Sequence, residues 1–562
     1  MLHGTAWRAA CGWLALGLAA AGGEAGETSF VEGGVPRLVR EAGAAWKRGE
    51  GFIECGGMNN FLYAGKALVE GDFHVRARLS ISGLKDSAAS FVLGPGSHFG
   101  FDGRGGQLFL EGPLFGGPAR LLGPNAAFLA EGSPFVFEAV RKGAELAFLI
   151  DGKEVHRTPF KAAGPLIFGF RPWRSTMQIS EFAASGDMRD LPKPPEDQTD
   201  VFVSGADGYH TYRIPAVIVT PKGTVLAFCE GRKKSSSDTG DIDIVMKRST
   251  DGGRTWSPMK VIADHGPHVI GNPCPVVDRA TGTIWMPLTR NRGDEPESQI
   301  MKGTTTEPRT VWLMKSTDDG LTWSEPVDIS ATTRQPHWRW YATGPGVGIQ
   351  LKSGRLLIPC DHSDHSDPST SLGPGPKKHP YGSHAIYSDD SGATWRLGGA
   401  ITERVNECQA AELADGSVMM NMRSYHGKNR RAVATSADGG LTWSPPVLDE
   451  ALIEPVCQAS LLRYTLEGPH DRNRLLFSNP ASTSRILMTV RLSYDEGKTW
   501  PVSNVLWPGP SAYSCLTVLP DLTLGCLYER GERHAYERIT FARFTLEWLS
   551  GGKDSLKPAG KP

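Results

Sequence analysis

Residues 249–256 read STDGGRTW, and this pattern, Ser-x-Asp-x-Gly-x-Thr-Trp, returns at 316–323, 388–395, 436–443 and 493–500. Each copy is flanked by short strand-like runs, for instance IDIVMKR before the first copy and PMKVIA after it. Asp and Gly at fixed offsets favour a tight turn held by hydrogen bonds between side chain and backbone. We therefore interpret each copy as a turn between two strands, with its Trp packing the hairpin against a neighbour.

The spacing of these turns sets the architecture. The copies start 67, 72, 48 and 57 residues apart, about 61 on average. Repeats of this length, each with four short strands, are typical of the blades of a β-propeller. At that spacing residues 201–549 hold about six repeats. The sequence therefore predicts an all-β, six-bladed β-propeller over 201–549, closed by pairing of the last strand, 539–549, with strands near residue 201.

Residues 28–187 have a different pattern. Short segments of alternating polar and apolar residues, such as FHVRARLSI at 73–81, are separated by Gly-rich turns, which indicates an antiparallel β-sandwich. Asp151-Gly152 is a two-residue hairpin signal between two such segments. The region resembles the concanavalin-like jelly rolls that accompany carbohydrate-active enzymes. Carbohydrate binding and a purely structural accessory role both remain open for it.

The N-terminus has the order of a secretory signal peptide. Arg8 precedes a short apolar run, GWLALGLAAA at 12–21, and small residues follow. The run is shorter than the roughly 20 residues that cross a bilayer, and no later stretch reaches that length. We expect removal of residues 1–25, no membrane span, and a secreted, periplasmic or cell-surface protein.

Two further segments are predicted from composition. Residues 188–200 (MRDLPKPPEDQTD) are rich in proline and charge, as linkers often are. Residues 550–562 (SGGKDSLKPAGKP) have no apolar periodicity, so we expect a disordered tail.

The overall charge argues against a nucleic-acid partner. Lys and Arg number 60 and Asp and Glu number 61, so the formal net charge is -1. Such a balance gives no general attraction to polyanions. The oligomeric state stays open, with a monomer favoured.

Metal and cofactor signals are absent from the sequence. The eight cysteines after the N-terminal segment are widely spaced without any CxxC pair, which is not zinc-site spacing. We expect mostly buried free thiols, with one or two disulfides as the alternative. The segment 361–384 is rich in His and Asp, but its spacing is irregular, and we interpret it as a long rim loop. No cofactor and no metal are expected.

A second motif, Tyr212-Arg213-Ile214-Pro215, stands just upstream of the first repeated turn. Together with the five turns, which match the Asp boxes of sialidases, it makes residues 201–549 resemble the bacterial exo-sialidase family. The resemblance implies a retaining exo-α-sialidase that removes terminal sialic acids from glycoproteins, mucins, gangliosides or oligosaccharides. A trans-sialidase and a non-catalytic sialic-acid-binding propeller are the alternatives.

The resemblance implies three substrate-binding arginines, Arg213, Arg423 (in NMRS) and Arg485 (in STSRILMTVRLS). Sialic acid carries an ionised carboxylate on its anomeric carbon. The planar guanidinium of Arg pairs with a carboxylate through two parallel hydrogen bonds and keeps its charge. Because the three arginines are far apart in sequence, only a closed ring can bring them together.

The same resemblance implies the catalytic residues. Tyr513 (in PSAYSCL) is the expected nucleophile and Glu407 (in NECQAAEL) its base, since a neutral phenol avoids the repulsion that an attacking carboxylate would meet at this substrate. Asp238 is the expected acid/base, six residues after Arg232, which would lie beside the substrate carboxylate and 4-hydroxyl. Asp241 and Asp243 compete for this role, but the IDIV alternation places them on the flank of a strand.

Two further sets of residues complete the expected site. Glu529 (in CLYERG) matches the family's glutamate that holds Arg213 in place. The aromatic residues Trp338, Trp340 and Tyr341 are candidates for an apolar contact with the N-acyl methyl group, and core packing explains them equally well.

Overall fold

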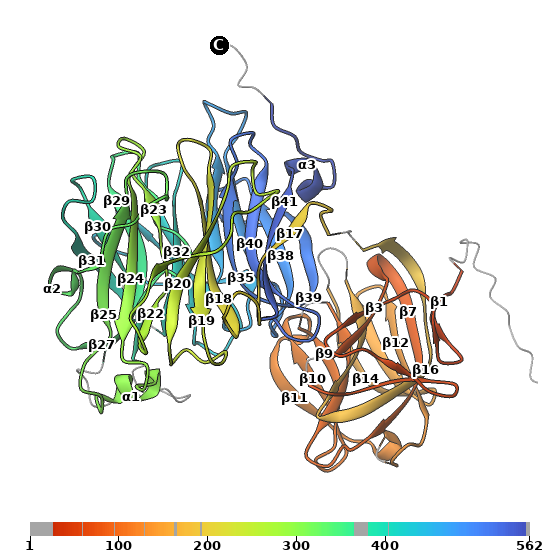
Figure 1. The fold of residues 1–562 in the computed structure, drawn as a ribbon. Helices are drawn as coiled ribbons and strands as arrows, with labels where there is room; N and C mark the ends of the chain where they lie inside the picture. Colours follow the sequence, from red (N-terminus) through yellow and green to blue (C-terminus); the bar gives the residue numbers. More distant parts are fainter. Residues whose placement is uncertain are drawn as a thin grey trace, which may run out of the picture.

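The computed structural model describes residues 26–557 except 59, 95, 129, 162–165, 192–193, 365–379 and 403. The fold is all-β, with three short α-helices in the part of the chain that is described: α1 (Glu297–Lys302), α2 (Ser330–Thr333) and α3 (Leu546–Ser550). Figure 1 shows the strands of the N-terminal third gathered in one body beside the remaining strands. The predicted signal peptide lies outside the described residues.

Two antiparallel sheets make up the N-terminal body. The first runs in the order β14 (Lys153–Pro159), β13 (Glu145–Ile150), β12 (Phe135–Lys142), β7 (Lys66–Ser82), β16 (Ser175–Asp190), β1 (Thr28–Glu32) and β2 (Val35–Pro36), with β5 (Ile53–Gly57) on β16 and β4 (Lys47–Arg48) on β5. The second runs in the order β11 (Gly117–Pro124), β10 (Gln107–Gly112), β9 (His98–Asp102), β8 (Ala88–Leu93), β15 (Phe168–Trp173), β6 (Phe61–Ala64) and β3 (Val39–Ala42). Short 3-10 turns occupy Pro113–Phe115 and Ala126–Phe128.

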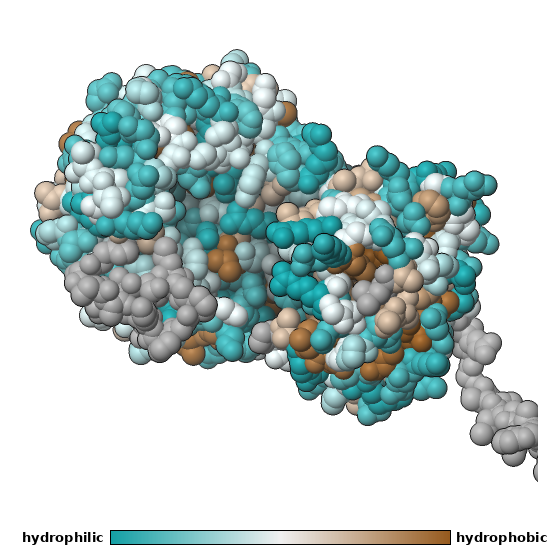
Figure 2. All heavy atoms as spheres, turned by 90° about the horizontal axis from the view of Figure 1, so that it is seen from below, coloured by the Kyte–Doolittle hydropathy of each residue, from teal (hydrophilic) through white to brown (hydrophobic). Residues whose placement is uncertain are grey.

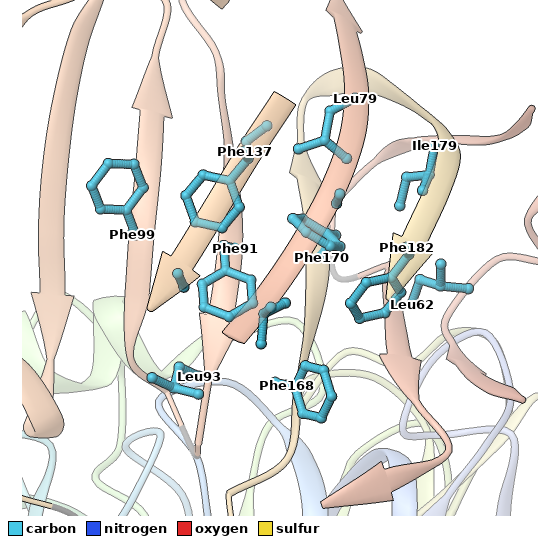
Figure 3. Packing of buried hydrophobic residues seen from close by; sticks show 14 of the residues in the cluster. Leu62, Leu79, Phe91, Leu93, Phe99, Phe137, Phe168, Phe170, Ile179 and Phe182 are labelled. Atoms are coloured by element: carbon cyan, nitrogen blue, oxygen red, sulfur yellow. The ribbon is translucent and has the colours of Figure 1, made fainter. Parts of the chain in front are cut away.

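Phenylalanine rings fill the space between these two sheets (Figure 3). Phe137 from β12 lies 5.1 Å from Phe91 of β8 and 5.4 Å from Phe99 of β9, measured between ring centroids. Phe182 from β16 lies 5.1 Å from Phe170 of β15. These rings are fully buried, and each contributes roughly 1.5–3 kcal/mol through burial alone. The apolar residues of the alternating pattern are therefore the ones that face the space between the two sheets.

The predicted hairpin at Asp151-Gly152 is confirmed. The two residues join β13 to β14, and both have positive φ, 49° and 73°. This backbone geometry suits the right-handed twist of the paired strands.

In the described residues the rest of the chain forms four sheets of nine, five, four and seven strands. For description we divide the nine- and the seven-stranded sheet in two, which gives six successive units, each paired antiparallel within itself. The first unit contains β18 (Thr211–Val219), β19 (Val225–Arg232), β20 (Ile242–Ser249) and β21 (Lys260–Ala263), and the second contains β22 (Val269–Gly271), β23 (Val276–Val277), β24 (Ile284–Asn291), β25 (Thr310–Ser316) and β26 (Val327–Asp328). The third contains β27 (Trp338–Thr343), β28 (Ile349–Gln350), β29 (Leu356–Asp364), β30 (Tyr381–Ser388) and β31 (Arg396–Ile401), and the fourth contains β32 (Val405–Glu412), β33 (Val418–Ser424), β34 (Arg430–Ser436) and β35 (Val447–Ile453). The fifth contains β36 (Ser460–Thr465), β37 (Arg474–Pro480), β38 (Ile486–Ser493) and the first part of β39 (Val502–Val518), and the sixth contains the second part of β39, β40 (Leu524–Arg530), β41 (Arg538–Phe544) and β17 (Gln198–Val203).

The repeated motif forms the turns of five of these units, as predicted. In the first copy the Ser249 hydroxyl donates to Asp251 (2.7 Å), the Thr255 hydroxyl donates to Asp251 (2.6 Å), and the Gly253 N–H donates to Ser249 (2.8 Å). The same three bonds recur in the other four copies. Each turn therefore satisfies its polar groups internally.

The tryptophans of the motif connect neighbouring units. Trp323 stands edge-on to Phe228 of the preceding unit, with 5.7 Å between ring centroids, and Trp256 stands edge-on to Phe541 of the last unit at 5.5 Å. The indole N–H of Trp500 donates to Asp449 of the preceding unit (3.1 Å). The predicted packing role of these tryptophans is confirmed.

The last unit combines the two ends of this region. β41 pairs with β17, from Gln198 opposite Ala542 to Val203 opposite Arg538, which confirms the predicted closure. The strand ends at Phe544, earlier than predicted, because Thr545 caps α3 by accepting a hydrogen bond from the Trp548 N–H. The predicted linker 188–200 is also shorter, since β16 runs to Asp190 and β17 begins at Gln198.

The prediction of a disordered tail from residue 550 is wrong for 550–557. Asp554 is buried, pairs with Arg474 (2.8 Å) and accepts a hydrogen bond from the Tyr494 hydroxyl (2.8 Å). Order here comes from an ion pair to a buried arginine, and a search for apolar periodicity does not detect such a contact. Residues 558–562 lie outside the described part.

All eight described cysteines are buried and unpaired, as expected for free thiols. No helix within the described residues is long and apolar enough to cross a membrane.

The turn geometry generates a stability prediction. Asp251→Ala should lower the free energy of unfolding by about 1–2 kcal/mol, because it removes the acceptor of several local hydrogen bonds. Urea unfolding followed by tryptophan fluorescence measures the change. Thr250→Ala is the matched control at the exposed neighbouring position. Equal stability of the two variants would contradict a stabilising role for the Asp251 carboxylate.

Candidate active site

A cavity of about 410 Å3 opens near the end of the units where α1 lies. Figure 2 looks at the molecule from this end. Seven of the eight predicted site residues line the cavity: Arg213, Arg232, Asp238, Glu407, Arg423, Arg485 and Tyr513. They come from four of the six units, so residues about 300 positions apart share one site.

The three predicted carboxylate-binding arginines converge on the cavity, each with a different partner. Nε of Arg213 donates to Glu529 (2.8 Å), Nη1 of Arg423 donates to Glu407 (2.8 Å), and Nη1 of Arg485 donates to the Tyr536 hydroxyl (2.6 Å). Two of these partners are carboxylates and one is a tyrosine hydroxyl. Three cations around one cavity form a strong site for a carboxylate.

Glu529 does more than hold Arg213. Its carboxylate is fully buried and also accepts hydrogen bonds from the backbone N–H groups of Ile214 (2.9 Å) and Tyr513 (3.0 Å). Ile214 has φ of 62°, a strained conformation for a β-branched residue. One carboxylate thus fixes an arginine, the strained backbone beside it and the backbone of the predicted nucleophile.

Tyr513 and Glu407 form the predicted pair. The Tyr513 hydroxyl donates a short hydrogen bond to Glu407 and lies 3.2 Å from Nη1 of Arg423. Burial and the neighbouring Glu407 carboxylate raise the pKa of Tyr513 well above its ordinary value. The phenol is therefore neutral in the free protein, and Glu407 is placed to take its proton.

Asp238 stands at the mouth of the cavity, in the loop between β19 and β20. One of its oxygens lies 2.6 Å from Nη2 of Arg232 and 4.0 Å from Nη1 of Arg213. Desolvation opposes ionisation, but the two guanidinium charges outweigh it and hold the pKa of Asp238 below its ordinary value. Asp238 is thus a carboxylate in the free protein.

The two competing aspartates do not line the cavity. Lys233 bridges them, with Nζ 2.8 Å from Asp241 and 3.0 Å from Asp243, and the Tyr209 hydroxyl donates to Asp243 (2.6 Å). Their carboxylates are paired with Lys233 in a separate, partly buried cluster outside the cavity, which agrees with discounting them.

Of the three aromatic candidates, only Trp340 lines the cavity. Trp338 stacks on His362, with ring centroids 3.6 Å apart, and Tyr341 is buried in the core of its unit. Trp340 and Tyr341 are neighbours in β27 and so point to opposite faces of the strand. The sequence alone could not say which face would meet the cavity.

One part of the cavity wall was missed by the sequence analysis. Asn272, Glu297, Arg309, Asp361, Tyr381 and Tyr425 line it together with Trp340. The Arg309 guanidinium lies 4.2 Å from the centroid of the Trp340 ring, and Tyr381 donates to Glu297 (2.5 Å). This part of the wall is polar, so the structure does not contain the apolar pocket that was expected there for the N-acyl methyl group. None of these residues belongs to a recognisable motif.

The predicted rim loop at 361–384 is wrong at both ends. Asp361–Asp364 belong to β29 and Tyr381–His384 to β30, and residues 365–379 lie outside the described part. His362 and His384 are buried, with their Nδ1 atoms 3.0 Å apart. Among the described residues, no group of three or more His, Cys, Asp or Glu is arranged to hold a metal ion.

The β units surround a cavity with three convergent arginines, a Tyr–Glu pair and a separate carboxylate, and this arrangement is suited to a carboxylate ligand. Comparison with known proteins identifies the family to which the chain belongs. Residues 223–527 match the BNR repeat-like domain family. The chain is 37% identical over 378 residues to a sialidase of Micromonospora viridifaciens, and the matched region covers 64% of this chain and 55% of that protein. It is 33% identical over 390 residues to an exo-alpha-sialidase of Arthroderma benhamiae, covering 63% of this chain and 88% of that protein.

Solved structures agree with this placement. A Hadza microbial sialidase matches with a TM-score of 0.57 and 25% identity, over 91% of this chain and 100% of that one. A leech intramolecular trans-sialidase matches with a TM-score of 0.53 and 16% identity, over 89% of this chain and 99% of that one, which supports the fold alone. This chain belongs to the sialidase family.

The arginine geometry generates a binding prediction. Arg485→Leu should raise the Kd of a sugar-acid inhibitor with a ring carboxylate by about 10- to 100-fold, the factor expected for a lost charge-assisted hydrogen bond. Arg485→Lys should fall between the wild type and Leu, because it keeps the charge but loses the planar guanidinium. Titration calorimetry measures Kd, and the half-exposed Arg472→Leu is the control. An unchanged Kd in Arg485→Leu would remove Arg485 from the carboxylate site.

Proposed function

We propose that this protein is an exo-α-sialidase that hydrolyses terminal α-linked sialic acids of glycoproteins, mucins, gangliosides or oligosaccharides, with retention at the anomeric carbon. The observation that carries the proposal is the short hydrogen bond from Tyr513 to Glu407 beside three arginines. A neutral nucleophile is what an anomeric carbon bearing a carboxylate requires, because an attacking carboxylate would meet charge repulsion.

Substrate binding prepares the acid. The sugar carboxylate pairs with Arg213, Arg423 and Arg485, and this offsets part of the positive charge that holds the pKa of Asp238 down. A bound sugar also displaces water from the cavity, which raises the pKa further. Asp238 then takes up a proton and stands ready to give it to the glycosidic oxygen.

The reaction proceeds in two displacements. As the Tyr513 oxygen bonds to the anomeric carbon, its proton passes to Glu407, the C–O bond to the leaving sugar breaks, and Asp238 protonates the leaving oxygen. Asp238, now a carboxylate, next accepts a proton from water, whose oxygen attacks the same carbon. The bond to Tyr513 breaks and Glu407 returns the proton to the phenol. Two inversions give net retention.

The proposal extends to the architecture. We assign the six antiparallel units to the blades of a six-bladed β-propeller and the N-terminal body to a concanavalin-like jelly-roll sandwich. Closure of β41 on β17 and the facing Phe-rich sheets support these assignments. Residues 1–25 are proposed as a signal peptide, which makes the protein secreted, periplasmic or attached to the cell surface, and the active form as a monomer.

Release of product tests the reaction class. Incubation with α2-3- and α2-6-sialyllactose should liberate free sialic acid, detected by chromatography. An anhydro sugar or a transferred sialic acid in its place would indicate a trans-sialidase. Binding without any release would indicate a non-catalytic sialic-acid-binding propeller, which the presence of Asp238, Glu407 and Tyr513 argues against.

The nucleophile is tested by trapping. A 3-fluoro sialyl fluoride should leave a covalent adduct on Tyr513, because the ring fluorine slows both formation and breakdown of the intermediate, while the good fluoride leaving group restores the rate of formation alone. Mass spectrometry of proteolytic peptides locates the adduct. Tyr513→Phe should form none. An adduct on Glu407 would reverse the roles of the pair.

Asp238→Asn tests acid catalysis. An alkoxide leaves only when protonated, whereas methylumbelliferone departs as a stable anion. The variant should therefore lose about 10²- to 10⁴-fold in kcat/KM on sialyllactose and much less on the aryl sialoside. Asp241→Asn is the matched control, since its carboxylate lies outside the cavity. Equal losses on both substrates, with the first displacement rate-limiting, would exclude Asp238 as the acid.

A further inference from the structure

The N-terminal body is fixed against the wall of the active site. Apolar residues from β3, β6 and β8 pack with residues at the start of β38, directly after Arg485, and the Gly43 N–H donates to the Glu532 carbonyl (2.9 Å). The cluster comprises Ala42, Phe61, Tyr63, Val92, Ile486 and Leu487. Because its members are all buried, the two bodies meet in a single defined arrangement.

A second cavity of about 410 Å3 lies between the two bodies. On the side of the N-terminal body it is lined by Glu111, Ala119 and the glycines at the turn between β10 and β11. On the other side it is lined by the hairpin between β33 and β34, with Lys428 and Arg430, and by Glu450 and Thr483. Neither body encloses it alone.

The two cavities share a wall. Gly427 lines the second cavity, and Tyr425, two residues earlier, lines the active site. Likewise Thr483 lines the second cavity and Arg485 lines the active site. Two residues span at most about 7 Å, so the separation is short on the scale of an oligosaccharide. Figure 2 shows the N-terminal body beside the hollowed face of the ring.

The lining suits an uncharged, hydroxyl-rich ligand. Two cations, Lys428 and Arg430, are balanced by two carboxylates, Glu111 and Glu450, so the cavity has no net attraction for an anion. Amide and hydroxyl groups and the backbone of exposed glycines supply both donors and acceptors. At Gly116 a Cβ would meet nothing within 4 Å, so the backbone there faces open space.

We propose that this interdomain cavity binds the neutral sugar residues to which the terminal sialic acid is attached. This inference rests on the proposed sialidase function. The carboxylate and the glycosidic oxygen are both substituents of the anomeric carbon, so the rest of the glycan begins beside the arginines. Arg423 and Arg485 stand on the wall that the two cavities share, and a glycan crossing that wall enters the second cavity. The N-terminal body then takes part in selecting the substrate.

Two variants test the proposal. Ala119→Trp fills the cavity from β11, and Lys428→Ala removes a donor from the opposite side. On a sialylated pentasaccharide each should lower kcat/KM by about 3- to 10-fold, the factor expected for one or two lost hydrogen bonds. On methylumbelliferyl sialoside, which has no further sugar, both should match the wild type. Arg120→Trp is the matched control, since neighbouring residues of a strand point to opposite faces and Arg120 does not line the cavity.

Equal losses on both substrates, or no loss on either, would overturn the proposal. A direct binding measurement tests the saccharide site independently of the proposed sialidase reaction. Saturation-transfer NMR should detect the same oligosaccharide without its sialic acid bound to the full chain and not to Ala119→Trp. Absence of binding to the wild type would overturn the cavity assignment even if sialic acid is released. Binding to the wild type without any hydrolysis would refute the sialidase reaction and leave the saccharide site standing.

Discussion

The buried carboxylate of Glu529 is the contact on which the site depends. It lies on β40 in the last unit and binds Arg213 and Ile214 of the first unit and the backbone of Tyr513 on β39. A buried carboxylate is costly unless paired and fully hydrogen-bonded, and here both conditions are met. β17, which precedes the first unit in the chain, pairs with β41 beside β40. The pairing that joins the two ends of this region therefore also brings Arg213 close to Glu529.

Arginine side chains gather around the cavity, and their pairing with carboxylates is uneven. Arg213 and Arg423 each have a carboxylate partner, but Arg485 donates to the Tyr536 hydroxyl. The positive charge also sets the ionisation of the groups around it. Asp238 stays ionised beside two guanidinium groups, while Tyr513 stays neutral because burial and Glu407 oppose its ionisation. A substrate carboxylate bound nearby would offset the guanidinium charges that lower the pKa of Asp238, so binding would favour protonation of Asp238.

The two bodies use different physical means to reach stability. The N-terminal sheets share a core of phenylalanines, and the six units rely on turns whose polar groups are satisfied locally and on tryptophans that reach the next unit. Placing the rigid sandwich against the start of β38 adds a second wall beside Arg485. Under the proposed function, the six units would supply the chemistry and the interdomain cavity would supply contacts farther along the glycan.

The sequence by itself determined the local features. The Asp and Thr of each repeated motif bond within eight residues, Asp151-Gly152 makes its turn from its own backbone preferences, and the family motifs mark Arg213, Asp238, Glu407 and Tyr513. Tertiary structure alone decided which of the remaining side chains reach the cavity: Trp340 but not Tyr341, and a polar wall with Arg309 and Glu297. It also ordered Asp554 through Arg474 and created the cavity between the two bodies. These outcomes depend on contacts between residues tens to hundreds of positions apart, which local pattern and propensity do not encode.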